Sequence, residues 1–170
     1  MIETDNLILR RPEIGDLDAI HAMRSDPEII RFLGGRPLSR EEAWHRLTRI
    51  VGHWTLRGYG MFAVVEKRSG TLVGEVGLFD GCRGLHAQFD AAPEAGWILA
   101  GAAHGKGYAG EAGAAAHRWF AATHGERRSV CIIAPENLAS FRVAYKLGYK
   151  SFGQVEYQNE PVVMLERIPG

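Results

Sequence analysis

Three glycines, Gly105, Gly107 and Gly110, lie between a short apolar run and a helical pattern. Glycine lets the backbone pass close to a ligand, and the first N–H groups of a helix have no partners inside it. The helix dipole adds partial positive charge there, and Lys106 adds a full one, so the segment suits a pyrophosphate. The alternative is a tight turn without a ligand, and the residues alone leave both readings open.

The same glycines also match the G-x-G-x-x-G pattern of dinucleotide-binding proteins. A dinucleotide-binding domain needs successive β-α units. Here one helix and then a hairpin-like pair of strands follow the glycines, and 170 residues leave little room for a separate substrate domain. We therefore reject an oxidoreductase.

A carboxylate that could take up a proton is Glu75, within the apolar and small residues Leu72–Leu78. Partial desolvation in such a strand raises a carboxyl pKa toward the range of a general base. A base of this kind could deprotonate an amine. The alternative is a surface carboxylate on a strand that is buried on one side only.

The elements that must position these groups follow from periodicity and turn residues. The run 95–100, the helix 107–123 and the run 129–134 form a β-α-β unit, which makes the two strands parallel. Hairpins on both sides of this unit predict a mixed α/β sheet with helices on both faces. Further strands are expected at 7–11, 61–66, 72–79, 150–157 and 162–167, further helices at 16–24, from 26, at 39–58 and at 137–147, and an irregular arm at 80–93.

Two helices have clear apolar faces. Ser39 and Glu42 form a capping-box sequence at the start of the first, and Gly58 ends it. Its predicted core residues are Trp44, Leu47, Val51 and Trp54, and Arg46, Arg49, His53 and Arg57 form a stripe expected to be solvated. The predicted buried face of the helix 107–123 comprises Ala112, Ala115, Ala116, Trp119 and Phe120.

Composition indicates one globular domain over residues 1–170. A formal net charge of zero gives no field to attract nucleic acid or a membrane. Two distant cysteines and scattered histidines predict neither a disulfide framework nor a metal site. The first residues have no basic segment followed by an apolar one, so we expect a cytoplasmic protein.

Two motifs carry a family resemblance. The residues His104-Gly-Lys-Gly-Tyr-Ala109 resemble the Q/R-x-x-G-x-G/A acetyl-CoA motif of the GNAT superfamily of N-acetyltransferases, with histidine at the first position. The residues Asn137–Tyr149 are similar to the N-x-x-S-x-R-V-x-x-K-x-G-[FY] helix of its Rim-type branch, the ribosomal-protein N-terminal acetyltransferases. Leu7–Pro12 and Leu72–Leu78 also fit that branch, so the resemblance covers nearly the whole chain.

The resemblance implies a GNAT fold, in which a sheet of six to seven strands opens between its two parallel strands. It implies that pantetheine enters this opening and pairs with the backbone around Ile98, Leu99 and Ala100. Asn137 would contact the cofactor near the thioester, although asparagine also favours a plain helix N-cap. The pyrophosphate would bind the loop formed by His104, Gly105, Lys106, Gly107, Tyr108, Ala109 and Gly110.

The resemblance also bears on acid and base. Rim-type enzymes place a glutamate in the strand that corresponds to that of Glu75. Many GNAT enzymes carry an acid tyrosine at the position of Ala144, which this chain lacks, and the adjacent Tyr145 should point elsewhere. Ser140 stands where Rim-type enzymes have a serine near the thiolate, although it could simply bond to the backbone.

The expected function is transfer of an acetyl group from acetyl-CoA to a primary amine. A protein N-terminal α-amine, a polyamine, an amino acid and an aminoglycoside all remain open as acceptors. The alternative is a non-catalytic acyl-CoA-binding or sensing module, which would keep the loop but would not need Glu75. We expect a monomer or a homodimer.

Overall fold

The structure, a computed structural model, describes residues 1–169. These residues form one sheet of eight strands in the order β1-β2-β3-β4-β5-β6-β8-β7. Paired strands are antiparallel except β5 and β6, which are parallel, so the predicted mixed sheet is confirmed. The sheet has eight strands, more than the six to seven expected. The strands are β1 (Ile2–Glu3), β2 (Leu7–Arg10), β3 (Met61–Glu66), β4 (Leu72–Phe79), β5 (Glu94–Leu99), β6 (Ser129–Ile133), β7 (Lys150–Tyr157) and β8 (Glu160–Arg167).

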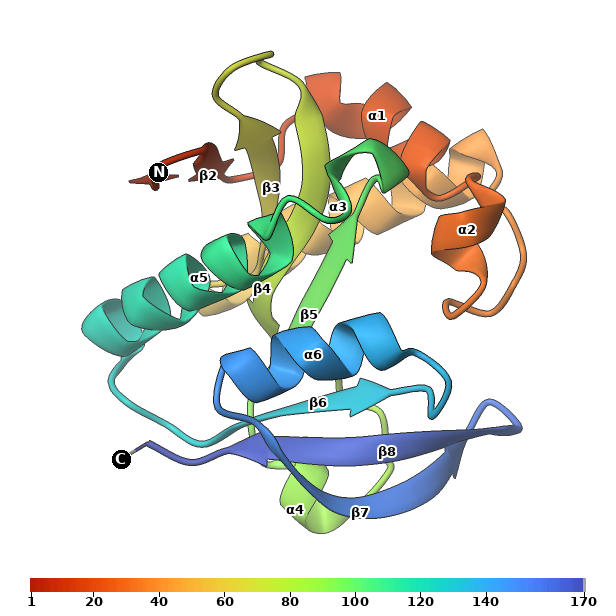
Figure 1. The fold of residues 1–170 in the computed structure, drawn as a ribbon, viewed down its shortest axis with the longest axis vertical. Helices are drawn as coiled ribbons and strands as arrows, with labels where there is room; N and C mark the ends of the chain where they lie inside the picture. Colours follow the sequence, from red (N-terminus) through yellow and green to blue (C-terminus); the bar gives the residue numbers. More distant parts are fainter. Residues whose placement is uncertain (170) are drawn as a thin grey trace.

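Helices cover both faces of the sheet (Figure 1). The helices α5 and α6 lie on one face, and α1 and α3 lie on the other. The α-helices are α1 (Leu17–Met23), α2 (Pro27–Ile30), α3 (Arg40–Arg57), α4 (Ala87–Asp90), α5 (Tyr108–His124) and α6 (Leu138–Lys146).

The parallel strands β5 and β6 separate soon after they begin. Among residues 1–169 their register has a single pair, Glu94 with Val130, next to a hydrogen bond from Val130 N–H to Pro93 O at 2.9 Å. Beyond this pair the two strands run in different directions (Figure 1). The predicted opening between the parallel strands is therefore confirmed, and it leaves one edge of β5 without a neighbouring strand.

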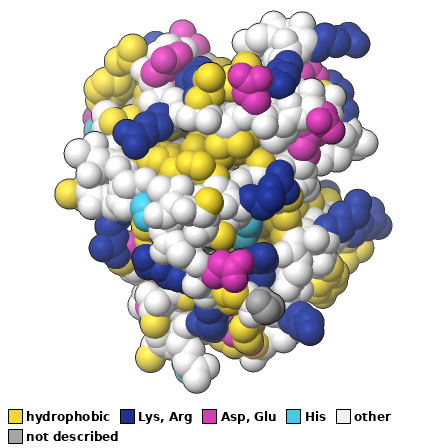
Figure 2. All heavy atoms as spheres, turned by 90° about the vertical axis from the view of Figure 1, so that its left-hand side faces the viewer, with side chains coloured by type: hydrophobic (Ala, Val, Ile, Leu, Met, Phe, Trp, Pro, Cys, Tyr) yellow, Lys and Arg dark blue, Asp and Glu magenta, His cyan; other side chains and the backbone are white. Residues whose placement is uncertain are grey.

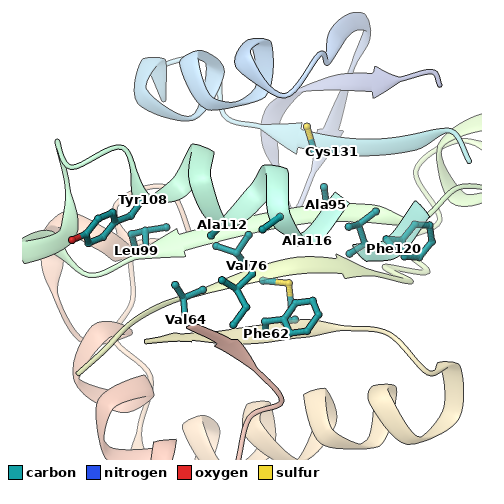
Figure 3. Packing of buried hydrophobic residues seen from close by; sticks show 14 of the residues in the cluster. Phe62, Val64, Val76, Ala95, Leu99, Tyr108, Ala112, Ala116, Phe120 and Cys131 are labelled. Carbon is teal, nitrogen blue, oxygen red and sulfur yellow. The ribbon is translucent and has the colours of Figure 1, made fainter. Parts of the chain in front are cut away.

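The helix α5 packs on the sheet through small side chains. Ala112 and Ala116 face Val76 of β4 (Figure 3), and both alanines are at most 1% exposed. Their size lets the helix backbone approach the strands closely, and Phe120 extends the contact at the end of the helix. The predicted buried face of this helix is confirmed for Ala112, Ala115, Ala116 and Phe120, while Trp119 is partly buried.

The caps of α3 are the predicted ones, and its buried face is the predicted one in part. Ser39 and Glu42 form the capping box, and Gly58 ends the helix at φ 76°. Trp44 and Val51 are 40% and 41% exposed, which contradicts the prediction that they are core residues. Leu47 and Trp54 are buried as predicted, and Ala43 and Ile50 complete the buried stripe. The sequence pattern favoured the larger apolar residues, whereas packing against α1 and the sheet places the small Ala43 inside.

Other local differences concern short elements. The strand β1 was not predicted, and α4 lies within the arm expected to be irregular. Asp16 does not cap α1 with its side chain, because its carboxylate accepts hydrogen bonds from Arg10 and from Glu13 N–H. The two residues of β1 and the four residues of α4 are too few to show a periodicity in the sequence. The contact between Arg10 and Asp16 depends on tertiary structure, which a local pattern does not show.

The surface bears on possible partners. Basic and acidic side chains are interspersed on the face shown in Figure 2. This face therefore has no continuous basic surface of the kind that binds nucleic-acid phosphates. Within residues 1–169 no helix has the length and apolar character needed to cross a membrane.

Candidate active site

The glycine loop joins β5 to α5 and leaves space above its backbone. Gly105 and Gly107 have φ values of 75° and 79°, which favour glycine. A Cβ added at Gly105, Gly107 or Gly110 would meet nothing within 4 Å. Gly107 is the N-cap of α5, and no side chain among residues 1–169 caps this helix. The first N–H groups of the helix therefore have no side-chain partner, an arrangement that is typical of a phosphate site.

Lys106 and Tyr108 both contact Glu66 at the end of β3. The Lys106 ammonium lies 3.1 Å from Glu66 Oε1, and the Tyr108 hydroxyl donates to the same oxygen at 2.8 Å. Hydrogen bonds from Ser69, Tyr108 and Lys106 lower the pKa of Glu66 to about 2. Part of the positive charge expected of Lys106 is therefore balanced by Glu66. A surface pocket of about 630 Å³ lies here, lined by Asp5, Asn6, Glu66, Lys67, Arg68, Lys106 and Tyr108.

The backbone of β5 shows which of its groups face the opening. Ala100 N–H donates to Val73 O at 2.8 Å, so Ile98 and Ala100 direct their backbone groups toward β4. Backbone groups alternate along a strand, so those of Trp97 and Leu99 face the gap beside β6. This geometry does not fit the expectation that Ile98 and Ala100 pair with pantetheine. Leu99 retains that role as a candidate, and Trp97 is added.

His104 lies close to this edge. Its Nε2 donates to Leu99 O at 3.0 Å, because a carbonyl oxygen can only accept. The first residue of the motif therefore fixes the end of β5 to the start of the glycine loop.

The start of α6 brings Asn137 and Ser140 to the other side of the opening. Asn137 Oδ1 accepts a hydrogen bond from Ser140 N–H at 3.1 Å, so asparagine acts as the N-cap. Ser140 Oγ accepts a hydrogen bond from Trp97 Nε1–H at 3.2 Å. The Trp97 side chain thus connects β5 to α6, a contact that the sequence reasoning missed.

The tyrosines of this region do not replace the missing acid. Ala144 is fully buried in the core, and Tyr145 is 56% exposed. The hydroxyl of Tyr149 is bonded to Ser129 and His117 in the interior. Ser140 is therefore the hydroxyl that the helix presents next to Trp97.

Glu75 is fully buried in β4, opposite Ile98 of β5. Its Oε2 contacts two guanidinium groups, Arg24 Nη2 at 3.2 Å and Arg46 Nη2 at 3.0 Å. Its Oε1 is buried and has no hydrogen-bond partner among the described residues. The expected burial is present, but the apolar surroundings inferred from the strand sequence are wrong, because two arginine side chains contact the carboxylate.

The arginines have an unusual environment. Arg24 follows α1, and burial together with the positive charge of Arg46 lowers its pKa to about 10, against the opposing effect of Glu75. Arg46 belongs to the helix stripe expected to be solvated, yet its side chain is only 16% exposed. His53 of the same stripe is also partly buried and bonds to Tyr59 O and Asp80 N–H, whereas Arg49 and Arg57 are exposed, so the prediction of a solvated stripe is wrong for two of its four members. No sequence pattern signalled Arg24.

Comparison with known proteins decides the family. The model for the Acetyltransferase (GNAT) domain matches residues 6–150. A protein from Bordetella pertussis, described as a GNAT-family acetyltransferase, is 32% identical in sequence and superposes with a TM-score of 0.87 over 98% of both chains. The protein belongs to the GNAT acetyltransferase family. It is an acetyl-CoA-dependent N-acetyltransferase, as the motifs predicted.

Other relatives of this GNAT enzyme differ in their acceptors. The uncharacterized protein YkkB of Bacillus subtilis is 27% identical over 96% of this chain and 93% of its own. RimL, a ribosomal L7/L12 α-N-protein acetyltransferase solved with coenzyme A, has a TM-score of 0.77 and 19% identity over 97% of this chain and 95% of its own. Spermidine N-acetyltransferase from Vibrio cholerae, solved with CoA and spermine, has a TM-score of 0.74 and 20% identity over 96% of this chain and 95% of its own. The shared fold therefore does not identify the acceptor.

Proposed function

We propose that this GNAT enzyme transfers the acetyl group directly to a primary amine, either a protein N-terminal α-amine or the amine of a small molecule. The observation that carries the proposal is the buried, unpartnered Oε1 of Glu75, opposite Ile98 in the sheet. An unpaired buried carboxylate oxygen is costly unless a ligand or water completes it.

Acetyl-CoA would supply an activated acetyl thioester. The N–H groups from Gly105 to Gly110 would hold its pyrophosphate, in the space where an added Cβ meets nothing. The edge of β5 at Trp97 and Leu99 would pair with pantetheine. Asn137 can cap α6 and face the ligand at the same time, because both roles occur at a helix start.

The two faces of the sheet would supply different groups. Glu75 contacts arginines from the α1 and α3 side, and Trp97 contacts Ser140 of α6 on the other side. The opening between β5 and β6 connects these sides. Glu75 Oε1 would accept a proton from the amine, directly or through water, and Ser140 would donate a hydrogen bond to the departing thiolate.

A first experiment measures CoA release from acetyl-CoA with a panel of amines. We predict that Glu75→Gln lowers kcat roughly 10²–10⁴-fold, the range of a positioned general base. Acetyl-CoA affinity, measured by titration calorimetry, should change little, because the carboxylate lies away from the glycine loop.

The variant Glu75→Asp separates catalysis from folding. It keeps the charge next to Arg24 and Arg46 but withdraws the carboxylate by one methylene. If Glu75 acts only as an ion-pair partner, Glu75→Asp should retain wild-type kcat with an unchanged melting curve. That result would remove Glu75 as the base.

A further inference from the structure

Four arginines from three segments lie on the acceptor side of Glu75. Arg24 follows α1, Arg46 and Arg49 belong to α3, and Arg83 lies in the arm before α4. Arg24 and Arg46 contact Glu75, as described above. Arg83 forms a bidentate pair with Glu94, with Nε–Oε2 at 2.6 Å and Nη2–Oε1 at 2.7 Å.

The position of Arg49 follows from the way α3 lies along β4. Arg46 contacts Glu75 of β4, and Arg57 contacts Asp80, which directly follows β4. Eleven residues of helix and five residues of strand both span about 16 Å, so the helix and the strand run side by side. Arg49 is one turn beyond Arg46 on the same side of α3. It therefore lies over β4 between the two contacts, next to the site of Glu75.

Arg49 is an exposed residue of α3, and its side chain forms no ion pair or hydrogen bond with another residue in the range 1–169. Its pKa is lowered by partial burial and by the positive charges of Arg46 and Arg83, against a smaller opposing effect of Glu75 and Tyr157. The Arg83 guanidinium lies over the Tyr157 ring at 4.8 Å, which brings the end of β7 toward the arm. The charged groups that act on Arg49 therefore come from α3, β4, the arm and the end of β7.

The charge balance of these groups is positive. The four guanidinium groups meet two buried carboxylates, Glu75 and Glu94. The carboxylate of Asp90 is near Glu94, but it accepts backbone N–H groups of Arg83, Gly84 and His86 within the arm. A second independent sign of an unfilled polar site is that Arg24 Nε and Glu75 Oε1 are both buried without partners among the described residues.

We propose that the acceptor amine also carries a carboxylate, which Arg49 binds while the amine lies at Glu75 Oε1. This inference rests on the proposed function. The planar guanidinium suits a carboxylate, whereas a polyamine or an aminoglycoside would bring further positive charge to a positive site. A free amino acid and the N-terminus of an acidic peptide share the required chemistry.

The test compares matched acceptors by calorimetry in the presence of CoA, which measures recognition without turnover. The pairs are L-glutamate against 1,4-diaminobutane, and the C-terminally amidated peptide Ser-Glu-Glu-Ala against Ser-Lys-Lys-Ala. We expect the anionic member of at least one pair to bind about tenfold more tightly or better, the effect of one charge-assisted hydrogen bond. Arg49→Gln should remove this preference. Arg118→Gln, an exposed charge change on α5, should retain it.

Tighter binding of the cationic members, or an unchanged preference in Arg49→Gln, would overturn the inference. The pair that shows the preference distinguishes an amino acid from a protein N-terminus. Acetyl transfer is then measured separately with acetyl-CoA. Anionic acceptors that bind without being acetylated would count against the proposed function and leave the inference about the acceptor intact.

Discussion

At the scale of single residues, the two oxygens of Glu75 have different surroundings. Oε2 accepts hydrogen bonds from both Arg24 and Arg46, which hold the carboxylate in place. Oε1 has no such partner among residues 1–169 and could receive a proton. The arginines would therefore orient the base, and the same arginines give the acceptor side its positive charge.

The hydroxyl of Ser140 also accepts a hydrogen bond on one side while its proton remains available on another. Trp97 Nε1–H occupies an acceptor position on Ser140 Oγ, so the serine proton can point toward another group. We predict that Trp97→Phe, which keeps a ring but removes the N–H, lowers kcat about threefold to tenfold, as expected for one neutral hydrogen bond. The KM for acetyl-CoA should change less than twofold. Steady-state kinetics with a saturating amine measures both values.

A double-mutant cycle identifies the role of Trp97. If the indole acts through Ser140, Trp97→Phe should cause no further loss of kcat in a Ser140→Ala background. Equal losses in both backgrounds would show that the two residues act independently. Trp44→Phe is the control, because Trp44 is 40% exposed and lies on α3.

Sequence could indicate Glu75 and Ser140 but not their neighbours. A carboxylate in an apolar run is visible locally, as is a serine in a helix motif. Arg24 and Arg46 are 51 and 29 residues from Glu75, and nothing in their local pattern directs them to it. The surroundings of the candidate base depend on how α1 and α3 pack on the sheet, which no short window of sequence contains.

At the scale of elements, the N-terminus of α5 has no capping side chain, and its first turn is bonded to the N-terminal segment of the chain. Its first-turn residue Glu111 accepts hydrogen bonds from Thr4 Oγ1, Asn6 N–H and Asn6 Nδ2. These hydrogen bonds connect the chain between β1 and β2 to α5. The helix that follows the glycine loop is thus attached to the segment that connects β1 and β2.

This geometry leads to a prediction for Gly107→Glu. The new side chain would enter the space above the loop and place negative charge where the pyrophosphate would bind. We expect acetyl-CoA affinity to fall at least about 100-fold, since a shift of about 2.7 kcal/mol follows from one unfavourable charge contact at short range. Calorimetric titration measures the affinity, and circular dichroism measures folding.

The control variant must introduce the same backbone strain and the same negative charge at a site away from the glycine loop. Gly35 also has a positive φ of 67°, and a Cβ added there would meet nothing within 4 Å. Gly35→Glu should therefore reproduce the strain of Gly107→Glu but retain acetyl-CoA binding. Wild-type affinity in Gly107→Glu would mean that the phosphates bind at another place.

Elements were predictable where caps and periodicity agree. The capping box Ser39–Glu42 and the stop at Gly58 identify α3 from local residues alone. The strand β1 and the helix α4 were missed because they are too short to show a period. The periodicity of α3 also could not show that Ala43 and not Trp44 is buried, because this depends on how α3 packs against α1.

At the scale of the whole molecule, a buried network joins the parts on either side of the opening. His117 of α5 and Ser129 of β6 both contact the hydroxyl of Tyr149, which follows α6, at 2.8 and 2.7 Å. His117 Nδ1 lies 2.7 Å from Gly113 O and must donate to it. Its Nε2 therefore accepts from Tyr149 O–H in the neutral ring, and Ser129 O–H donates to Tyr149.

The network makes stability depend on the charge of His117. Burial lowers the pKa of His117 to about 4, from 6.5 for an unperturbed histidine. The neutral form is favoured in the folded state, so this stabilisation is fully present above pH 6.5. As pH falls toward 4, the unfolded chain binds a proton that the folded chain does not, and stability is lost. Carboxylates with lowered pKa, such as Glu66, lose their contribution only at lower pH.

We therefore predict that the free energy of unfolding falls by about 2 kcal/mol between pH 7 and pH 5 because of His117. Urea unfolding at both pH values measures the change. In His117→Leu the protein should be less stable at pH 7, because Tyr149 loses a partner, but its stability should depend much less on pH in this range. His45→Leu, at an exposed position of α3, should keep the full dependence. An equal pH dependence in His117→Leu and the wild type would show that other groups weaken the fold in acid.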